Sequence, residues 1–126
     1  MNPGASSSVA APRTSAVLTK AVVRASRSLG LSQKTIAATL GVSEASVSRL
    51  TRGRTIDPAG KEGELAILFV RLYRSLDSLL GGDDAGARSW MHAHNLHLGA
   101  VPAEMIRTVT GLTHVIEYLD AMRGKS

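Results

Sequence analysis

The stretch QKTIAATLGVSEASVSRL, from Gln33 to Leu50, decides the fold of this 126-residue chain. It divides at Gly41 into two short helical runs, and each run follows a serine, a residue type that caps helix N-termini. Ala37 is small where two crossing helices touch, and Gly41 gives the turn a permissive backbone. The apolar contacts that would lock the helices together come from Ile36, Leu40, Val42, Val47 and Leu50. The spacing predicts a helix-turn-helix, with an ordinary helical hairpin as the alternative.

The second predicted helix runs from Ser43 to Arg52, and the side chains that it leaves facing outward are small, polar or basic. They are Ser43, Glu44, Ala45, Ser48, Arg49 and Arg52. A helix that enters the DNA major groove needs such a face, because it must fit between the phosphate backbones and offer hydrogen-bonding groups to base edges. This face therefore indicates DNA binding.

The charge of the chain is concentrated in its N-terminal half. Residues 1–60 hold eight Lys or Arg against Glu44 and Asp57, a net charge of +6, whereas residues 61–126 hold seven basic and eight acidic residues, a net charge of −1. A positive field confined to the half that holds the helix-turn-helix is expected of a part that meets a polyanion. A solvated basic face is the plainer explanation of the charge taken alone.

The same stretch resembles the helix-turn-helix of Xre/Cro-type bacterial repressors. The resemblance implies that Gln33 and Lys34 hold phosphates and fix the register on the duplex. It also implies contacts to base edges or flanking phosphates from Ser43, Glu44, Ser48, Arg49 and Arg52. Glu44 either reads a cytosine amino group or caps its own helix. Phosphate contact and plain solvent exposure are both open for a further set of basic residues, namely Arg54, Lys20, Arg24 and Arg27.

One such domain binds DNA weakly, so we expect a homodimer or a larger assembly that meets half-sites about 34 Å apart. Leucines and a phenylalanine recur every three or four residues after residue 62 and predict an apolar helix face. The predicted dimerisation residues on it are Leu65, Leu68, Phe69, Leu72 and Leu76. The alternative is that this face packs inside a single chain.

The rest of the chain predicts an all-α protein in two parts. Residues 1–14 are rich in Ser, Ala and Pro without periodicity and predict a disordered arm. Residues 15–56 form the DNA-binding domain, and RGRTIDPAGKEG (52–63) contains the connector that follows it. Residues 62–126 form a second domain, with helices expected over 62–80, 88–92, 111–123 and a short one opened by Pro102. No segment shows the alternation of a strand.

Composition narrows the chemistry further. Aromatic residues are only 3% of the chain against 44% hydrophobic overall, so the core must be aliphatic, which favours helices. Cysteine is absent, which excludes disulfides and thiolate chemistry. No apolar run approaches the roughly 20 residues of a membrane span, and the N-terminus lacks the apolar core of a secretory signal. We expect a cytoplasmic protein.

Three histidines lie within six residues in WMHAHNLH (90–97). His92, His94 and His97 could ligate zinc with His114, but no cysteine or well-spaced acid completes a tetrahedral set. Ser89 and Asp83 lie nearby without the order of nucleophile, base and orienting acid that catalysis needs. We therefore expect no metal, no cofactor and no catalytic residue here, and interpret the histidines as surface and loop residues around Trp90.

The layout that follows Trp90 is more informative than the histidines. A polar loop, Leu-Gly, Pro102 opening a helix, and a final apolar helix in LGAVPAEMIRTVTGLTHVIEYLDAMRGKS (98–126) resemble the toxin-binding domain of the Xre/MbcA/ParS antitoxin family. The resemblance covers roughly residues 62–126. The family commonly has a second glycine where this chain has Ala100, and an alanine would be strained there if the position needs a positive φ.

The resemblance implies an antitoxin that forms a complex with a RES-domain toxin, an NAD+-consuming enzyme with a fold similar to ADP-ribosyltransferases. The C-terminal domain would cover the active-site cleft of the toxin, a steric effect that needs no chemistry from this chain. We expect toxin contacts from Trp90, Arg107, Glu117, Asp120, Arg123, Lys125 and Ser126. The tail RGKS (123–126) either reaches into the toxin pocket or frays in solvent.

The resemblance thus predicts a non-enzymatic antitoxin that represses its own operon by binding operator DNA. A second hypothesis is a stand-alone transcription factor whose C-terminal half senses a metal or a small molecule. A third, a hydrolase built on the histidine-rich segment, predicts loss of activity when His92 or His94 is substituted.

Overall fold

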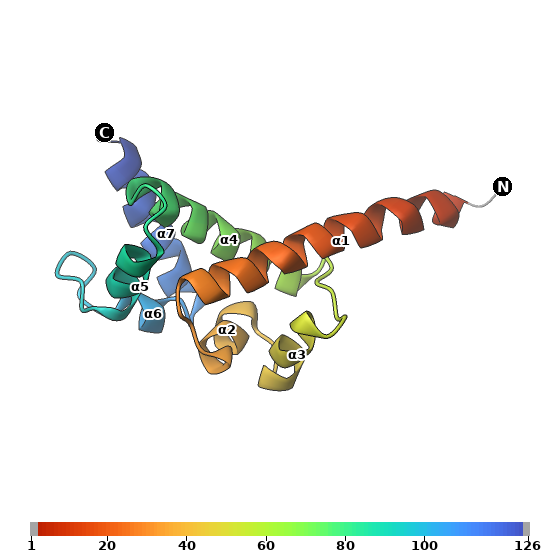
Figure 1. The fold of residues 1–126 in the computed structure, drawn as a ribbon, viewed down its shortest axis with the longest axis horizontal. Coiled ribbons are helices and arrows are strands. Elements are labelled where there is room, and N and C mark those ends of the chain that lie inside the picture. Colours follow the sequence, from red (N-terminus) through yellow and green to blue (C-terminus); the bar gives the residue numbers. More distant parts are fainter. Residues whose placement is uncertain (1–2, 125–126) are drawn as a thin grey trace.

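A computed structural model describes residues 3–124 of the chain, and the side chains of 13–124, as a helical protein without a strand in that range. The all-α prediction is therefore confirmed (Figure 1). The elements are α1 (Pro3–Ser28), α2 (Gln33–Leu40), α3 (Glu44–Ser48), the 3-10 turn η1 (Arg49–Thr51), α4 (Lys61–Leu79), α5 (Asp84–His92), α6 (Pro102–Met105) and α7 (Val109–Gly124). Over the described residues, no helix combines the length and the apolar character that a bilayer span requires.

The first helix extends into the segment for which the sequence predicts an arm without regular structure. α1 starts at Pro3, whereas the sequence predicts a disordered arm over residues 1–14. Extending an existing helix by one residue adds one hydrogen bond, whereas starting one fixes several residues for a single bond. The packed part of α1 therefore serves as the nucleus for its alanine-rich beginning, which projects beyond the body of the molecule in Figure 1.

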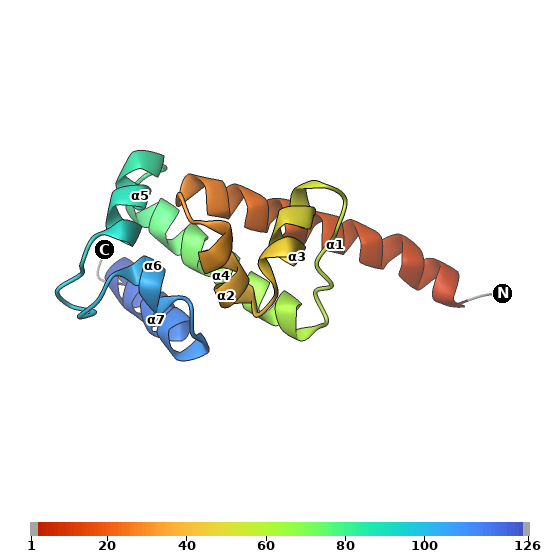
Figure 2. The ribbon, with the colours of Figure 1, turned by 90° about the horizontal axis from the view of Figure 1, so that it is seen from below.

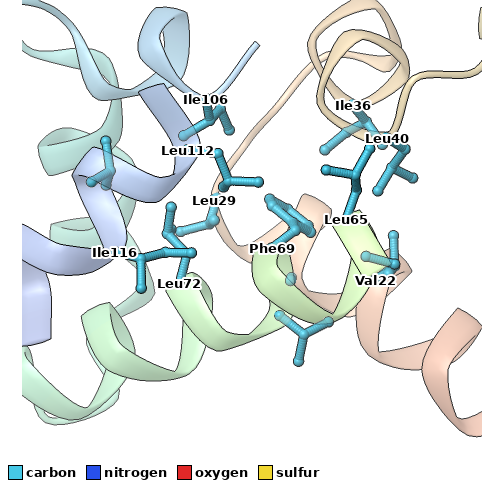
Figure 3. Packing of buried hydrophobic residues seen from close by; sticks show 14 of the residues in the cluster. Val22, Leu29, Ile36, Leu40, Leu65, Phe69, Leu72, Ile106, Leu112 and Ile116 are labelled. Atoms are coloured by element: carbon cyan, nitrogen blue, oxygen red, sulfur yellow. The ribbon is translucent and has the colours of Figure 1, made fainter. Parts of the chain in front are cut away.

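The central element is α4, against which α1, α2 and α7 all pack. Figures 1 and 2 show α1 crossing α4, with α2 and α3 on one side and α7 toward the far end. Figure 3 shows Phe69 of α4 between Val22 and Leu29 of α1, with Ile36 of α2 close by. Leu112 and Ile116 of α7 belong to the same buried cluster. Residues from both halves of the chain thus share one hydrophobic core.

The prediction of a dimer seam along α4 is wrong. Phe69 and Leu72 are 0% exposed, Leu76 is 1% exposed and Leu65 is 9% exposed, while Leu68 is partly buried against the same cluster. These side chains fill the core of a single chain because three other helices cover the apolar face of α4. A second copy could reach them only by unpacking the fold.

The connector between η1 and α4 is part of the packed body. Ile56 is fully buried, and its N–H donates to Oγ1 of Thr19 at 2.9 Å, across 37 residues of sequence. The same hydroxyl donates to the carbonyl of Ser15 at 2.7 Å. This buried polar pair anchors the loop to α1, and neither end of it was identified from the sequence.

Candidate DNA and toxin interfaces

The turn between α2 and α3 has the geometry that its sequence predicts. Ser32 and Ser43 cap the two helices, each accepting an N–H bond at 3.1 Å, from Thr35 and Ser46 respectively. Gly41 ends α2 in the left-handed region, with φ of 70°, and its N–H donates to the carbonyl of Ala37. Two serine caps and one left-handed glycine thus set the crossing of the two helices.

The second motif helix is shorter than predicted. Regular α-helix ends at Ser48, and residues Arg49–Thr51 continue as a 3-10 turn. Arg52 closes this turn and its Nη2 donates to Oγ of Ser48 at 3.0 Å. Arg49 and Arg52 therefore project from a 3-10 turn, which is wound more tightly than the α-helix that the sequence predicts.

All but one of the predicted DNA-contacting residues of the motif are exposed. Gln33, Lys34, Ser43, Glu44, Arg49 and Arg52 are exposed, and Ser48 is half-buried. Since Ser43 provides the cap of α3, Glu44 is not needed for that role and stands in the first helical turn. No salt bridge within the described residues involves Arg49 or Arg52. Their positive charge is free of internal compensation.

Arg54 differs from the other predicted DNA contacts. Its Nη2 lies 2.7 Å from Oε1 of Glu62, and the two side chains are only 26% and 17% exposed. This half-buried ion pair ties the connector to the first turn of α4. The structure therefore counts against Arg54 as a phosphate contact and gives it a structural role.

The basic stripe of α1 borders the motif, since all three of its residues line a hollow with Thr51 of η1. Lys20, Arg24 and Arg27 are exposed. Arg27 lines a hollow of about 340 Å³ together with Gln33 and Ser48. It therefore extends the basic surface of the helix-turn-helix onto α1.

The C-terminal half carries a row of stacked rings. Trp90 of α5 stacks on Tyr118 of α7, with ring centroids 6.4 Å apart and planes at 17°. His97 stacks on the same tyrosine, at 6.0 Å and 27°. Trp90 is half-buried, so one part of it packs on the core cluster and another faces outward. Tyr118 was not singled out from the sequence, because its partners lie at least 20 residues away.

The histidines are dispersed. His92 lies 3.0 Å from the carbonyl of Leu29 through Nε2 and so links α5 to the end of α1. His97 stacks on Tyr118, while His94 and His114 are exposed. In the part of the chain that the structure describes, no three His, Cys, Asp or Glu side chains gather in a way that could hold a metal ion.

The loop between α5 and α6 accommodates Ala100 without strain. Gly99 takes the left-handed conformation, with φ of 76°, and no residue other than glycine has a positive φ in the described chain. Ala100 accepts the N–H of Asn95 at 2.9 Å in an isolated antiparallel bridge. One glycine is enough for this turn.

Two of the predicted toxin contacts are engaged inside the chain. Asp120 of α7 accepts hydrogen bonds from Arg71 and, at 3.3 Å, from the buried Ser75, both on α4. Arg123 donates to Oγ of Ser75 at 3.0 Å. This polar cluster holds α7 against α4, so the structure gives Asp120 and Arg123 an internal role.

The remaining predicted toxin contacts lie on the outside or beyond the described residues. Glu117 is exposed on α7 and lines a shallow hollow of about 380 Å³ with Val109, Thr110, Thr113 and His114. Arg107 pairs with Glu104 at 3.5 Å on the surface. Lys125 and Ser126 lie outside the residues that the structure describes.

This geometry defines a helix-turn-helix DNA-binding protein with a second, near-neutral helical surface. Two family models match the chain: that of the antitoxin Xre-like helix-turn-helix domain over residues 8–71, and that of the antitoxin Xre/MbcA/ParS C-terminal toxin-binding domain over residues 75–125. The chain belongs to the Xre/MbcA/ParS-type antitoxins. Both matches meet inside α4, the helix that the two halves share. A search among curated proteins finds no match.

Proposed function

We propose that this antitoxin neutralises a RES-domain, NAD+-degrading toxin by covering its active site, and that it represses its own operon by binding operator DNA. Support comes from the arrangement of two separate surfaces on one core, a cationic helix-turn-helix and a row of stacked aromatic rings. The toxin would be blocked by steric exclusion of its dinucleotide substrate, so the chain acts without catalysis, cofactor or metal. Its site of action is the cytoplasm, where operator and toxin are both accessible.

The observation that carries the DNA-binding role is the exposed pair Arg49 and Arg52 at the end of the motif, which forms no salt bridge with any residue that the structure describes. Each phosphate contact contributes about 0.9 to the slope of log K against log salt. Removing both arginines with Arg49→Ala and Arg52→Ala should weaken binding to the upstream promoter DNA at least about tenfold and flatten this slope.

Arg54→Ala is the matched control, because it removes an equal charge only a few residues away. It should leave promoter affinity within about threefold and instead lower the melting temperature, since it frees a half-buried Glu62. Titrations by fluorescence anisotropy at several salt concentrations measure both effects. Equal losses of affinity for the two kinds of variant would contradict the proposed surface.

We infer that two copies associate through a groove between α1 and α4. With the leucines of α4 occupied in the core, the exposed apolar side chains on this side are Val17, 64% exposed, and Ile67, 50% exposed. Both line a hollow of about 540 Å³. Native mass spectrometry of the wild type and of Ile67→Asp tests this interface. We expect the wild type to be a dimer and the variant to be a monomer. A variant that remains a dimer would contradict the proposed interface.

The toxin-facing surface is proposed on the outer strip of α7 around Thr113, His114 and Glu117, beside the Trp90–Tyr118 stack. Co-expression with the reading frame adjacent to this gene, followed by purification through a tag on this chain, tests the role. We expect a stable complex and rescue of growth. A toxin that is neither captured nor neutralised would refute the proposed function.

The tail remains part of the proposal through Lys125 and Ser126, which would enter the toxin pocket. A chain truncated after Gly124, which keeps the Arg123 bond to Ser75, should lose neutralisation while it retains promoter binding. If it neutralises as well as the full chain, the tail has no such role.

A further inference from the structure

The loop between α5 and α6 carries the most exposed large apolar side chain in the described part of the molecule. Leu96 is 88% exposed, a greater fraction than Val17 at 64% or Val109 at 59%. The loop projects from the body of the protein, as the cyan segment between α5 and α6 in Figure 1 shows. A leucine held in water at a loop tip buries nothing within its own chain, so any stabilising role for it requires a partner.

The loop is held in one conformation by its own hydrogen bonds. The N–H of Asn95 donates to the carbonyl of Ala100 at 2.9 Å, and the N–H of Gly99 donates to the carbonyl of Asn95 at 2.8 Å. The side-chain oxygen of Asn95 accepts the N–H of Leu98 at 3.0 Å. Because the tip is already ordered, Leu96 can be buried by a partner at a small additional cost in loop entropy.

The neighbours of Leu96 connect it to α7. His97, the next residue, folds back onto Tyr118, whereas Leu96 remains in solvent. Tyr118 follows the exposed His114 by four residues and therefore stands beside it on the helix. The loop tip, the ring row and the outer strip of α7 thus form one continuous surface. A single exposed leucine is ordinary on a protein surface. A leucine at the end of a continuous surface that includes stacked aromatic rings is typical of a protein-binding site.

We propose that Leu96 is the apolar anchor by which the antitoxin grips the toxin, inserting into an apolar pocket on the surface of that protein. The inference rests on the proposed function. The loop lies within residues 75–125, which match a toxin-binding domain, and not within the DNA-binding match. A leucine offers neither charge nor hydrogen bonds to phosphates or base edges, so an apolar protein pocket suits it better than a DNA groove. The anchor fixes the loop beside the toxin while α7 covers the active site.

Leu96→Asp and Leu96→Ala test the anchor in the full-length protein, with the toxin from the adjacent reading frame immobilised as the probe. Loss of a buried leucine contact should weaken toxin binding about 10- to 100-fold for alanine and more for aspartate. Promoter affinity and melting temperature should stay at the wild-type values, because the side chain is 88% exposed.

Leu80→Asp is the control, since Leu80 is a 36% exposed leucine at the end of α4 in the same matched region. It should leave toxin affinity within about threefold. Toxin binding by Leu96→Asp at the wild-type level would overturn the anchor while the proposed function stands. A change in the oligomeric mass of the toxin-free variant would also overturn it, because the partner would then be a second copy. Failure of the wild-type chain to bind the toxin overturns both proposals.

Discussion

The two halves of the molecule are built by different kinds of contact. Residues 32–52 are shaped by bonds that span three or four residues, such as the serine caps of α2 and α3 and the Arg52–Ser48 bond. The region from α5 to α7 is shaped by contacts across long stretches of sequence, with His92 bonded to Leu29 and Arg71 to Asp120. A motif with locally fixed geometry is recognisable in any sequence that holds it, whereas a surface assembled at long range depends on the whole fold.

The largest expected effect comes from the residue that joins the two halves. Phe69 is fully buried where α1, α2 and α7 meet α4. Phe69→Ala should lower the free energy of unfolding by about 3–5 kcal/mol, because it leaves a cavity in the shared core. Helicity by circular dichroism and Trp90 fluorescence should be lost together on heating. Leu80→Ala, at a partly exposed position, should cost about 0.5 kcal/mol or less.

Separate transitions for the two signals in Phe69→Ala would show that the halves unfold independently. The contrast between locally and globally built regions would then describe two domains rather than two parts of one core.

A close approach in the C-terminal half gives the next largest effect. A Cβ at Gly111 would lie 1.9 Å from the carbonyl oxygen of Met105, a backbone atom that cannot move without shifting α6 against α7. Gly111→Ala should cost about 1–3 kcal/mol in chemical denaturation and also weaken toxin binding. Gly124→Ala, with no atom within 4 Å of the added methyl, is the matched control and should be neutral. A stable, toxin-binding Gly111→Ala protein would mean that these helices are not in close contact.

A smaller effect is expected at the equivalent point of the N-terminal half. Gly41 has φ of 70°, and an added Cβ would meet only Leu65 Cδ1 at an ordinary 3.7 Å. Gly41→Ala should therefore cost only the left-handed backbone conformation, about 1–2 kcal/mol. Promoter binding should weaken while toxin binding persists. If both activities fall equally, the turn is not a local feature.

The features that could be predicted from the sequence are those that depend on contacts between residues close together in the chain. The caps at Ser32 and Ser43, the turn at Gly41 and most helix positions were predicted from local patterns and are confirmed. The apolar face of α4 was also recognised, but its partner was not. A leucine stripe has the same spacing whether it packs on its own chain or on another, and here it packs on its own chain.

The residues predicted to contact DNA or toxin fall into two groups, those that stay exposed and those that bond within the chain. Arg49 and Arg52 are exposed as predicted, although a 3-10 turn and not the expected α-helix carries them. Arg54, Asp120 and Arg123 were assigned to partners by residue type, and each bonds within the chain. Leu96 went unnoticed because a leucine in sequence gives no sign of being left in solvent.

The sequence by itself determined the helical class, the DNA-reading motif and the order of the two parts, because helix periodicity, caps and glycine turns act over a few residues. Only the tertiary structure decided that α4 is a shared core helix, which charged side chains bond internally, and which side chains of α7 and its neighbouring loop stay exposed. Those outcomes depend on which faces meet across the chain, and a local pattern carries no information about its distant neighbour.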